Sequence, residues 1–223
     1  MTRQSFTQAL PIILLAGLLA MSCGAGEEPA SDDAATAEVA SETESAPGAT
    51  QDAGARFEFT STDYWDSGIT YHVTSPNSGS INRVTITPSG LERDNSPIEI
   101  EVDGTIMGAE VGDLNADGAP EIYVYAVSAG SGSYGSLIGY SPNNRKSLTP
   151  VYLPPVSDNP ETAPGYMGHD EFAVVENSLV QRFPVYEDGD TNAQPTGGTR
   201  QVQYRLEAGE AGWVLRPYNV VEY

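Results

Sequence analysis

Apolar and polar residues alternate over much of the chain, a pattern typical of β-strands with one buried face. The alternation is clearest in three segments, 69–73, 83–87 and 98–102. Further strands are predicted at 136–140, 171–175, 179–186, 200–206 and 213–215, the last two forming a hairpin through 208–212. No segment keeps an apolar period of 3.6 residues over three turns, so no amphipathic helix is expected.

The segment 121–127 differs because it is apolar at nearly every position (Glu-Ile-Tyr-Val-Tyr-Ala-Val). Such a run predicts a central strand that is covered on both faces. Many short strands separated by Gly, Pro, Asn and Asp are typical of a sandwich or barrel. With no internal repeat, the sequence predicts an all-β fold, an antiparallel β-sandwich-like single domain over 56–223.

The first 22 residues indicate an export signal, with Arg3 followed by an apolar run at 9–21 that is short for a membrane span. The next residue, Cys23, is the only cysteine, and the run Ala-Met-Ser before it resembles the lipobox of bacterial lipoproteins. The resemblance implies cleavage before Cys23 and lipidation of its sulfur, and Gly24 implies the periplasmic side of the outer membrane. An ordinary secretory signal, with a freely periplasmic or cell-surface protein, is the alternative.

Residues 23–55 are predicted to form a disordered acidic tether behind the lipidated Cys23. The stretch 24–55 consists mainly of Ala, Ser, Thr, Gly and eight acidic residues, with no Lys, Arg or aromatic residue. Such a segment cannot bury enough apolar surface to offset the entropy of ordering, and its charges repel one another. It would hold the folded domain away from the bilayer.

Charge excludes two classes of partner. The 223 residues include 31 acidic and 10 basic ones, a formal net charge of −21. A polyanion is repelled by nucleic acid and by anionic membrane surfaces, so no nucleic acid is expected and membrane contact only through Cys23. Residues 56–223 alone keep 23 acidic and 9 basic residues, a net charge of −14. A single cysteine also excludes an intramolecular disulfide and a cysteine zinc site.

The segment 113–121 opens like a calcium loop, with oxygen-bearing side chains at alternate positions followed by a glycine. The twelfth position, where a bidentate Glu would stand, is Val124, and a strand is predicted to follow. One interpretation is an Asx-rich turn leading into that strand. The other is a structural calcium site in a calcium-binding surface or adhesion module, with ligands Asp113, Asn115, Asp117 and Glu121.

A second segment, 128–136, reads Ser-Ala-Gly-Ser-Gly-Ser-Tyr-Gly-Ser between two predicted strands. Its glycines preclude a buried regular element and its hydroxyls are expected at an exposed tip. A phosphate loop would need a Lys and a following helix, which are missing. A hydrolase would need Ser131 beside a base such as His169, but there is no Gly-x-Ser-x-Gly elbow with a helix behind it. We therefore expect no enzyme activity.

The run 128–140, together with 146–153, 165–174, 181–186 and 190–200, resembles the periplasmic inhibitors of invertebrate-type lysozyme. The resemblance covers most of 110–217. It implies an all-β, often dimeric domain that plugs the active-site cleft of the lysozyme with a Ser/Gly/Tyr loop. It also implies that Ser131 and Tyr134 are the inhibitory side chains, while the rest of the loop shapes its backbone: Gly130, Gly132, Ser133 and Gly135. Many relatives are freely periplasmic, so the lipid anchor is a departure.

The function expected from the sequence is thus inhibition of an invertebrate-type lysozyme, without a cofactor, in protection of bacterial peptidoglycan. Hydroxyl donors can bond the two carboxyl groups of a lysozyme cleft without burying an unpaired charge. Lysozymes that attack anionic cell walls are often basic, so an acidic inhibitor would also gain association rate.

Overall fold

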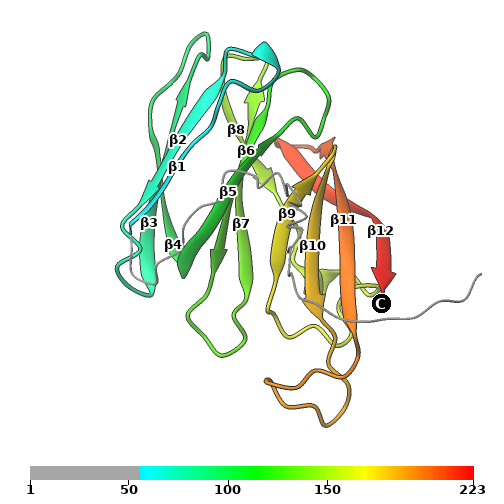
Figure 1. The fold of residues 1–223 in the computed structure, drawn as a ribbon. Coiled ribbons are helices and arrows are strands. Elements are labelled where there is room, and N and C mark those ends of the chain that lie inside the picture. Colours follow the sequence, from blue (N-terminus) through cyan, green and yellow to red (C-terminus); the bar gives the residue numbers. More distant parts are fainter. Residues whose placement is uncertain (1–55) are drawn as a thin grey trace, which may run out of the picture. The chain divides into compact units, whose positions relative to one another are not determined.

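The structure, a computed structural model, describes residues 56–223, which form two β-sheets (Figure 1). The helical segments within that range are two short 3₁₀ turns, η1 (Tyr64–Asp66) and η2 (Val156–Asp158). Among these residues, no helix is long and apolar enough to cross a membrane. The predicted signal peptide at 1–22, Cys23 and the tether at 23–55 lie outside the described residues.

The first sheet has four antiparallel strands in the order β1-β2-β3-β4. Their bounds are Phe57–Thr60 for β1, Thr70–Ser75 for β2, Ile81–Ser89 for β3 and Ile98–Asp103 for β4. Strands β2 and β3 alternate between buried and more exposed residues along their whole length. One face of this sheet therefore packs against the rest of the domain.

The second sheet has eight strands in the order β5-β6-β7-β8-β12-β11-β10-β9. The bounds are Thr105–Gly112 for β5, Glu121–Val127 for β6, Gly135–Asn143 for β7, Ser147–Tyr152 for β8, Glu171–Val175 for β9, Ser178–Pro184 for β10, Thr199–Ala208 for β11 and Trp213–Glu222 for β12. All neighbours are antiparallel except β8 and β12, which pair in parallel over two residues of each strand. The predicted hairpin of β11 and β12 is confirmed.

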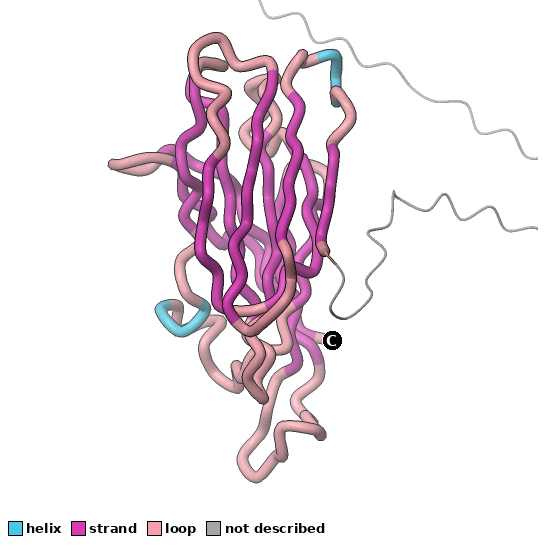
Figure 2. The backbone as a smooth tube through the Cα atoms, turned by 90° about the vertical axis from the view of Figure 1, so that its left-hand side faces the viewer, coloured by secondary structure: helices cyan, strands magenta, loops and turns pink. Residues whose placement is uncertain are grey.

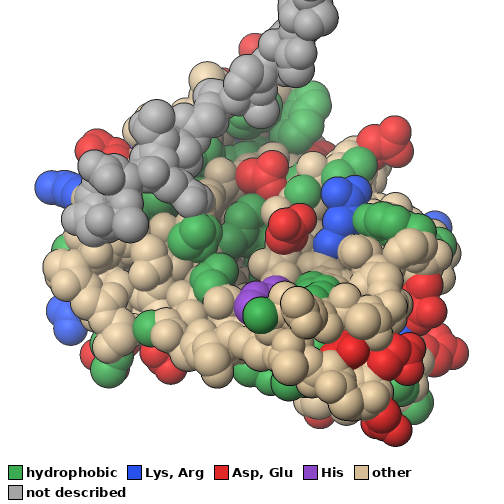
Figure 3. All heavy atoms as spheres, turned by 60° about the horizontal axis from the view of Figure 1, so that its bottom comes forward, with side chains coloured by type: hydrophobic (Ala, Val, Ile, Leu, Met, Phe, Trp, Pro, Cys, Tyr) green, Lys and Arg blue, Asp and Glu red, His purple; other side chains and the backbone are tan. Residues whose placement is uncertain are grey.

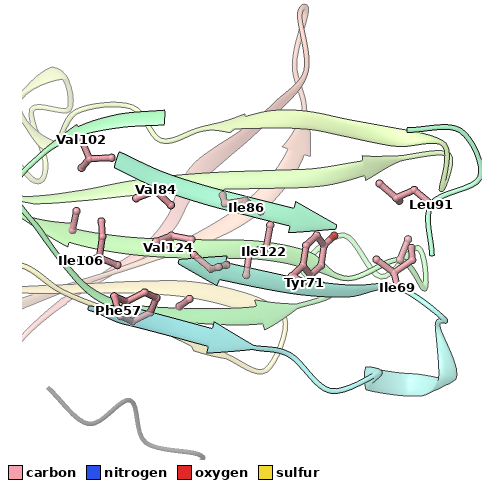
Figure 4. Packing of buried hydrophobic residues seen from close by; sticks show 14 residues of the cluster. Phe57, Ile69, Tyr71, Val84, Ile86, Leu91, Val102, Ile106, Ile122 and Val124 are labelled. Carbon is pink, nitrogen blue, oxygen red and sulfur yellow. The ribbon is translucent and has the colours of Figure 1, made fainter. Parts of the chain in front are cut away.

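Strand β6 belongs to two hydrophobic clusters. Ile122, Val124 and Ala126 pack against the four-stranded sheet, beside residues such as Val84 and Ile86 (Figure 4). Tyr123 and Tyr125 point to the other side, where the eight-stranded sheet encloses its own cluster with Leu179, Phe183, Val202, Tyr204 and Leu215. This two-sided burial explains why 121–127 is continuously apolar, and it confirms the predicted central strand.

The edges of the eight-stranded sheet are joined by a side chain. Glu110 of β5 accepts hydrogen bonds from the backbone N–H of Val174 in β9 (2.9 Å) and from the Tyr125 hydroxyl (2.6 Å). The sheet is therefore curled toward a barrel on one side and forms a sandwich with the first sheet on the other, as predicted. Its strands run along the domain, and most of the loops lie toward the two ends (Figure 2).

Three strands were not expected from the sequence: β1, β5 and β8. Strand β1 has only four residues, and β8 contains Pro150. In β5 the register shifts between Ile106 and Gly108, so buried Ile106 and Ala109 are three residues apart rather than two. A bulge of this kind hides a strand from a search for alternation.

Candidate functional site

The loop between β6 and β7 is a compact closed turn at the lower end of the domain in Figure 1. The backbone N–H of Ser128 donates to the carbonyl of Tyr134 (2.9 Å), and the N–H of Tyr134 donates to the Ser128 hydroxyl (3.0 Å). Inside the turn, the N–H of Ser133 donates to the carbonyl of Gly130 (3.0 Å), and Ser133 has a positive φ of 43°. The hairpin setting predicted for this segment is confirmed.

A neighbouring loop, 165–170, holds this turn from the side. The backbone N–H of His169 donates to the carbonyls of Gly132 (2.9 Å) and Ser133 (3.2 Å). Gly168, just before it, has a φ of +89°, and a Cβ there would lie 2.1 Å from the carbonyl oxygen of Gly132. Only glycine fits this close approach, so the two loops are docked backbone to backbone.

A third loop, 187–198, reaches the tip of the turn. The Asn192 side-chain amide donates to the carbonyl of Ser131, and the Asn192 carbonyl accepts from the Tyr186 hydroxyl (3.0 Å). This loop is closed by Asp190, which accepts from the backbone N–H groups of Glu187 and Thr196 (both 2.8 Å). These hydrogen bonds hold the pKa of Asp190 below its ordinary value.

The two predicted inhibitory side chains lie on the outside of the turn. Ser131 is exposed and Tyr134 is 47% exposed, and within residues 56–223 neither hydroxyl has a hydrogen-bond partner. The Tyr134 ring lies over Gly132 and meets the ring of Tyr166 edge-on, with centroids 5.7 Å apart at 73°. Tyr166 in turn meets Phe183 of β10 at 4.7 Å and 71°. The exposed Tyr134 ring is thus supported by two successive aromatic contacts that lead to β10.

A buried carboxylate lies beneath the turn. Asp170 is 8% exposed and accepts hydrogen bonds from the N–H of Gly135 (2.8 Å), the hydroxyl of Tyr166 (2.8 Å) and the amide of Gln181 (2.7 Å). The hydroxyl of Tyr204 donates to the other end of the Gln181 amide (2.7 Å). Burial raises the pKa of Asp170 above its ordinary value, and the three hydrogen bonds partly offset that effect.

A groove of about 540 Å³ lies beside the turn. Its walls include Tyr134, Tyr166, Leu137, Leu153 and the segment 154–156, and all of its lining residues are uncharged. In Figure 3, which brings the lower end of Figure 1 forward, apolar side chains show in the hollowed middle of this face and acidic ones gather toward one edge. The turn and groove together form the candidate site.

The loops bring Ser131 and His169 into one neighbourhood without a catalytic pair. The imidazole Nε2 lies 3.4 Å from the side-chain oxygen of Asn192, and the ring stacks on Tyr186 at 6.4 Å between centroids. Among the described residues, the Ser131 hydroxyl makes no hydrogen bond to that ring. The carboxylate of Asp170 is engaged by the Gly135 N–H, so it does not orient the imidazole.

The predicted calcium segment forms the turn between β5 and β6, at the other end of β6. Asp113 accepts from the backbone N–H groups of Asp117 (3.0 Å) and Gly118 (2.9 Å), and Asn115 accepts from that of Asp117 (2.9 Å). Asp117 accepts from the N–H of Ala119 (2.8 Å). These are the hydrogen bonds of an Asx-rich turn.

Glu121 lies below that turn and is completely buried. It accepts from the N–H of Leu114 (2.8 Å) and from the Ser141 hydroxyl (3.2 Å), and burial raises its pKa to about 8. Within residues 56–223, no group of three or more His, Cys, Asp or Glu side chains is placed to hold a metal ion. Calcium binding therefore stays a prediction.

We compared the chain with protein families, with curated proteins and with solved structures. Nothing matches.

The outer side of the turn is open to contact, because Ser131 and Tyr134 are both exposed. The turn projects two hydroxyl groups and one aromatic ring from a backbone that is fixed at 128, 132, 133 and 135. Four side chains that brace the turn were not predicted as site residues from the sequence: Tyr166, Asp170, Gln181 and Asn192. Their partners lie on other loops and strands, up to 61 residues away for Asn192 and Ser131.

Proposed function

We propose that this protein inhibits invertebrate-type lysozyme by inserting the turn at 128–135 into the active-site cleft. The observation that carries the proposal is the pairing of a rigid, uncharged turn with two outward hydroxyl groups that have no partner within residues 56–223, on Ser131 and Tyr134. These are the residues that resemble the inhibitory pair of the known inhibitors. Gly132 and Gly135 leave room for the Tyr134 ring and for Asp170, since a Cβ at either would lie within 2.5 Å of them, and Ser133 turns the backbone with a positive φ. A Cβ at Gly130 would meet no other atom within 4 Å.

The chemistry of the target supports this pairing. A glycosidase of this kind cuts its substrate with two carboxyl groups that differ in protonation. A hydroxyl group donates to a carboxylate and also accepts from a carboxylic acid, so it suits either group. Because the hydroxyls are neutral, their burial in the complex does not leave an unpaired charge.

The rigidity of the turn also supports tight inhibition. Ordering a loop during association costs free energy that is subtracted from the affinity. Here the loop is already held before any partner binds, because His169 and Asn192 donate hydrogen bonds to its carbonyls and Asp170 accepts one from the Gly135 N–H. Tyr134 adds a half-exposed ring of the type that anchors protein interfaces.

The proposed setting is the bacterial periplasm. A lipid at Cys23 would hold the protein to the periplasmic side of the outer membrane, with a freely periplasmic or cell-surface protein as the alternative. The inhibitor would act without a cofactor and would protect peptidoglycan from an incoming lysozyme. A homodimer is part of the same proposal, because the similar inhibitors are often dimeric.

The test is the lysis of a peptidoglycan suspension by an invertebrate-type lysozyme, with wild-type protein and with Ser131→Ala, Tyr134→Ala and the double variant. Loss of an interface anchor costs about 2 kcal/mol, so Tyr134→Ala should weaken inhibition by roughly 30-fold. Ser89→Ala, an exposed serine at the end of β3 and away from the turn and groove, is the matched control and should inhibit like wild type. A double variant as potent as wild type would refute the proposal.

A further inference from the structure

Burying the side chain of Asp170 costs folding free energy. Its carboxylate is nine-tenths buried, and an ionised group in such surroundings loses its hydration. An apolar side chain would fill the same space without that cost, but would leave the partly buried N–H of Gly135 and the Tyr166 hydroxyl without this acceptor. The hydrogen bonds that Asp170 accepts from Gly135 and Tyr166 therefore explain why a carboxylate stands at this position.

Those groups lead to the turn by two routes. One oxygen of the carboxylate, Oδ2, accepts from both the Gly135 N–H and the Tyr166 hydroxyl, at 2.8 Å each. The first bond fixes the end of the turn where β7 begins. The second fixes the ring of Tyr166, which the exposed Tyr134 ring meets edge-on.

The remaining oxygen ties this arrangement to the core. Oδ1 accepts from the Gln181 amide in β10, which accepts from the hydroxyl of Tyr204 in β11. Gln181 and Tyr204 are buried, so they form a fixed base for the carboxylate. A Cβ at Gly135 would lie 2.5 Å from that of Asp170, which shows how closely the turn is seated on this base.

We propose that Asp170 is a positioning residue that holds the turn at 128–135, backbone and Tyr134 ring together, in the conformation that enters the lysozyme cleft. This inference rests on the proposed function. Asp170 itself does not touch the partner; it acts through Gly135 and Tyr166. Its removal should leave the inhibitory side chains in place but unfixed, so that the complex forms and then dissociates faster.

The experiment compares Asp170→Ala, Asp170→Asn and a stability control, Ile86→Ala, which opens a cavity in the core of the four-stranded sheet. Asp170→Ala should weaken inhibition at least tenfold, mainly through faster dissociation. Asp170→Asn should restore most of it, because the amide oxygen can accept from Gly135 and Tyr166 while a flipped Gln181 accepts from the amide nitrogen. Ile86→Ala should lower the melting temperature and leave inhibition unchanged.

Hydrogen exchange of the turn supplies a readout that a loss of global stability does not reproduce. In Asp170→Ala, the backbone amide of Gly135 should exchange faster relative to the core strands, whereas in Ile86→Ala it should not. Tyr166→Phe keeps the ring and removes one bond to the carboxylate, so it should weaken inhibition several-fold. If Asp170→Ala does not fold, inhibition by Tyr166→Phe tests the same positioning role.

The outcomes separate the two proposals. If Ser131→Ala/Tyr134→Ala loses inhibition while Asp170→Ala and Tyr166→Phe inhibit like wild type, Asp170 is not a positioning residue and the proposed function stands. If the wild-type protein does not inhibit the lysozyme, the proposed function fails. Unchanged exchange of the Gly135 amide in Asp170→Ala would then overturn the positioning of the turn as well.

Discussion

Glu121 shows how much one side chain in this domain can depend on pH. It is the first residue of β6 and is completely buried below the turn at 113–120, and burial raises its pKa to about 8 from an ordinary value of 4.5. The folded protein therefore binds a proton here that the unfolded chain releases across that range. Because the native state holds more protons, the free energy of unfolding falls as pH rises from 4.5 through 8.

Glu121→Gln removes this titration. The amide oxygen can still accept from the Leu114 N–H, so the variant should fold. We expect its stability relative to wild type to increase between pH 5 and pH 8.5, by an amount on the order of a few kcal/mol. Urea denaturation at several pH values measures the difference. An exposed control, Glu210→Gln, should run parallel to wild type, and a Glu121→Gln curve that does the same would contradict the assignment.

At the scale of elements, the eight-stranded sheet depends on one bridge between its edges. Glu110 in β5 is the acceptor for the Val174 N–H of β9 and for the Tyr125 hydroxyl. Tyr125 is buried, and it stacks on Phe172 of β9 with centroids 5.6 Å apart at 17°. Loss of the carboxylate should weaken the contact between β5 and β9, the two edge strands of the curled sheet.

Glu110→Ala should lower the free energy of unfolding by about 1–3 kcal/mol, the cost of an unsatisfied buried polar group. The Val174 amide should lose protection in hydrogen exchange, while amides of β2 and β3 keep theirs relative to the global value. Glu101→Ala, on an exposed position of β4, is the control. Equal protection of Val174 in wild type, Glu110→Ala and Glu101→Ala would show that the contact between β5 and β9 does not depend on Glu110.

The sequence was informative where burial follows a regular period and uninformative where it does not. Alternation marked β2, β3 and β4 because each lies on the core with one face. The bulge of β5 and the proline of β8 broke that period. At the site, Ser131 and Tyr134 stand in a local motif, whereas Asp170 gains its role from Gly135, 35 residues earlier, and from Gln181, 11 residues later.

At the scale of the whole molecule, charge should influence how the protein meets the proposed lysozyme partner. Residues 56–223 carry a net charge of −14, and the exposed Glu187 and Asp188 lie on the loop that contacts the tip of the turn. A basic lysozyme would be drawn toward this end from beyond contact distance. The turn and groove are uncharged, so attraction governs the encounter and the neutral groups govern the final fit.

The association rate with a basic lysozyme should therefore fall several-fold between roughly 50 and 300 mM salt, because the Debye length shortens. The dissociation rate should change little. Stopped-flow or surface-based kinetics can separate the two rates. Glu187→Gln/Asp188→Asn should lower the association rate at low salt and reduce its salt dependence, and Asp190 is left intact because it closes the loop. An association rate that stays the same at low and high salt would contradict electrostatic attraction.

Strand β6 has a consequence for how the domain unfolds. Its odd and even residues belong to different hydrophobic clusters, so neither cluster can open without removing one face of this strand from its neighbours. The two sheets should therefore melt together, in one cooperative transition. The turn at 128–135 begins directly after Val127, the last residue of β6. The start of this turn should therefore stay fixed until the whole domain unfolds.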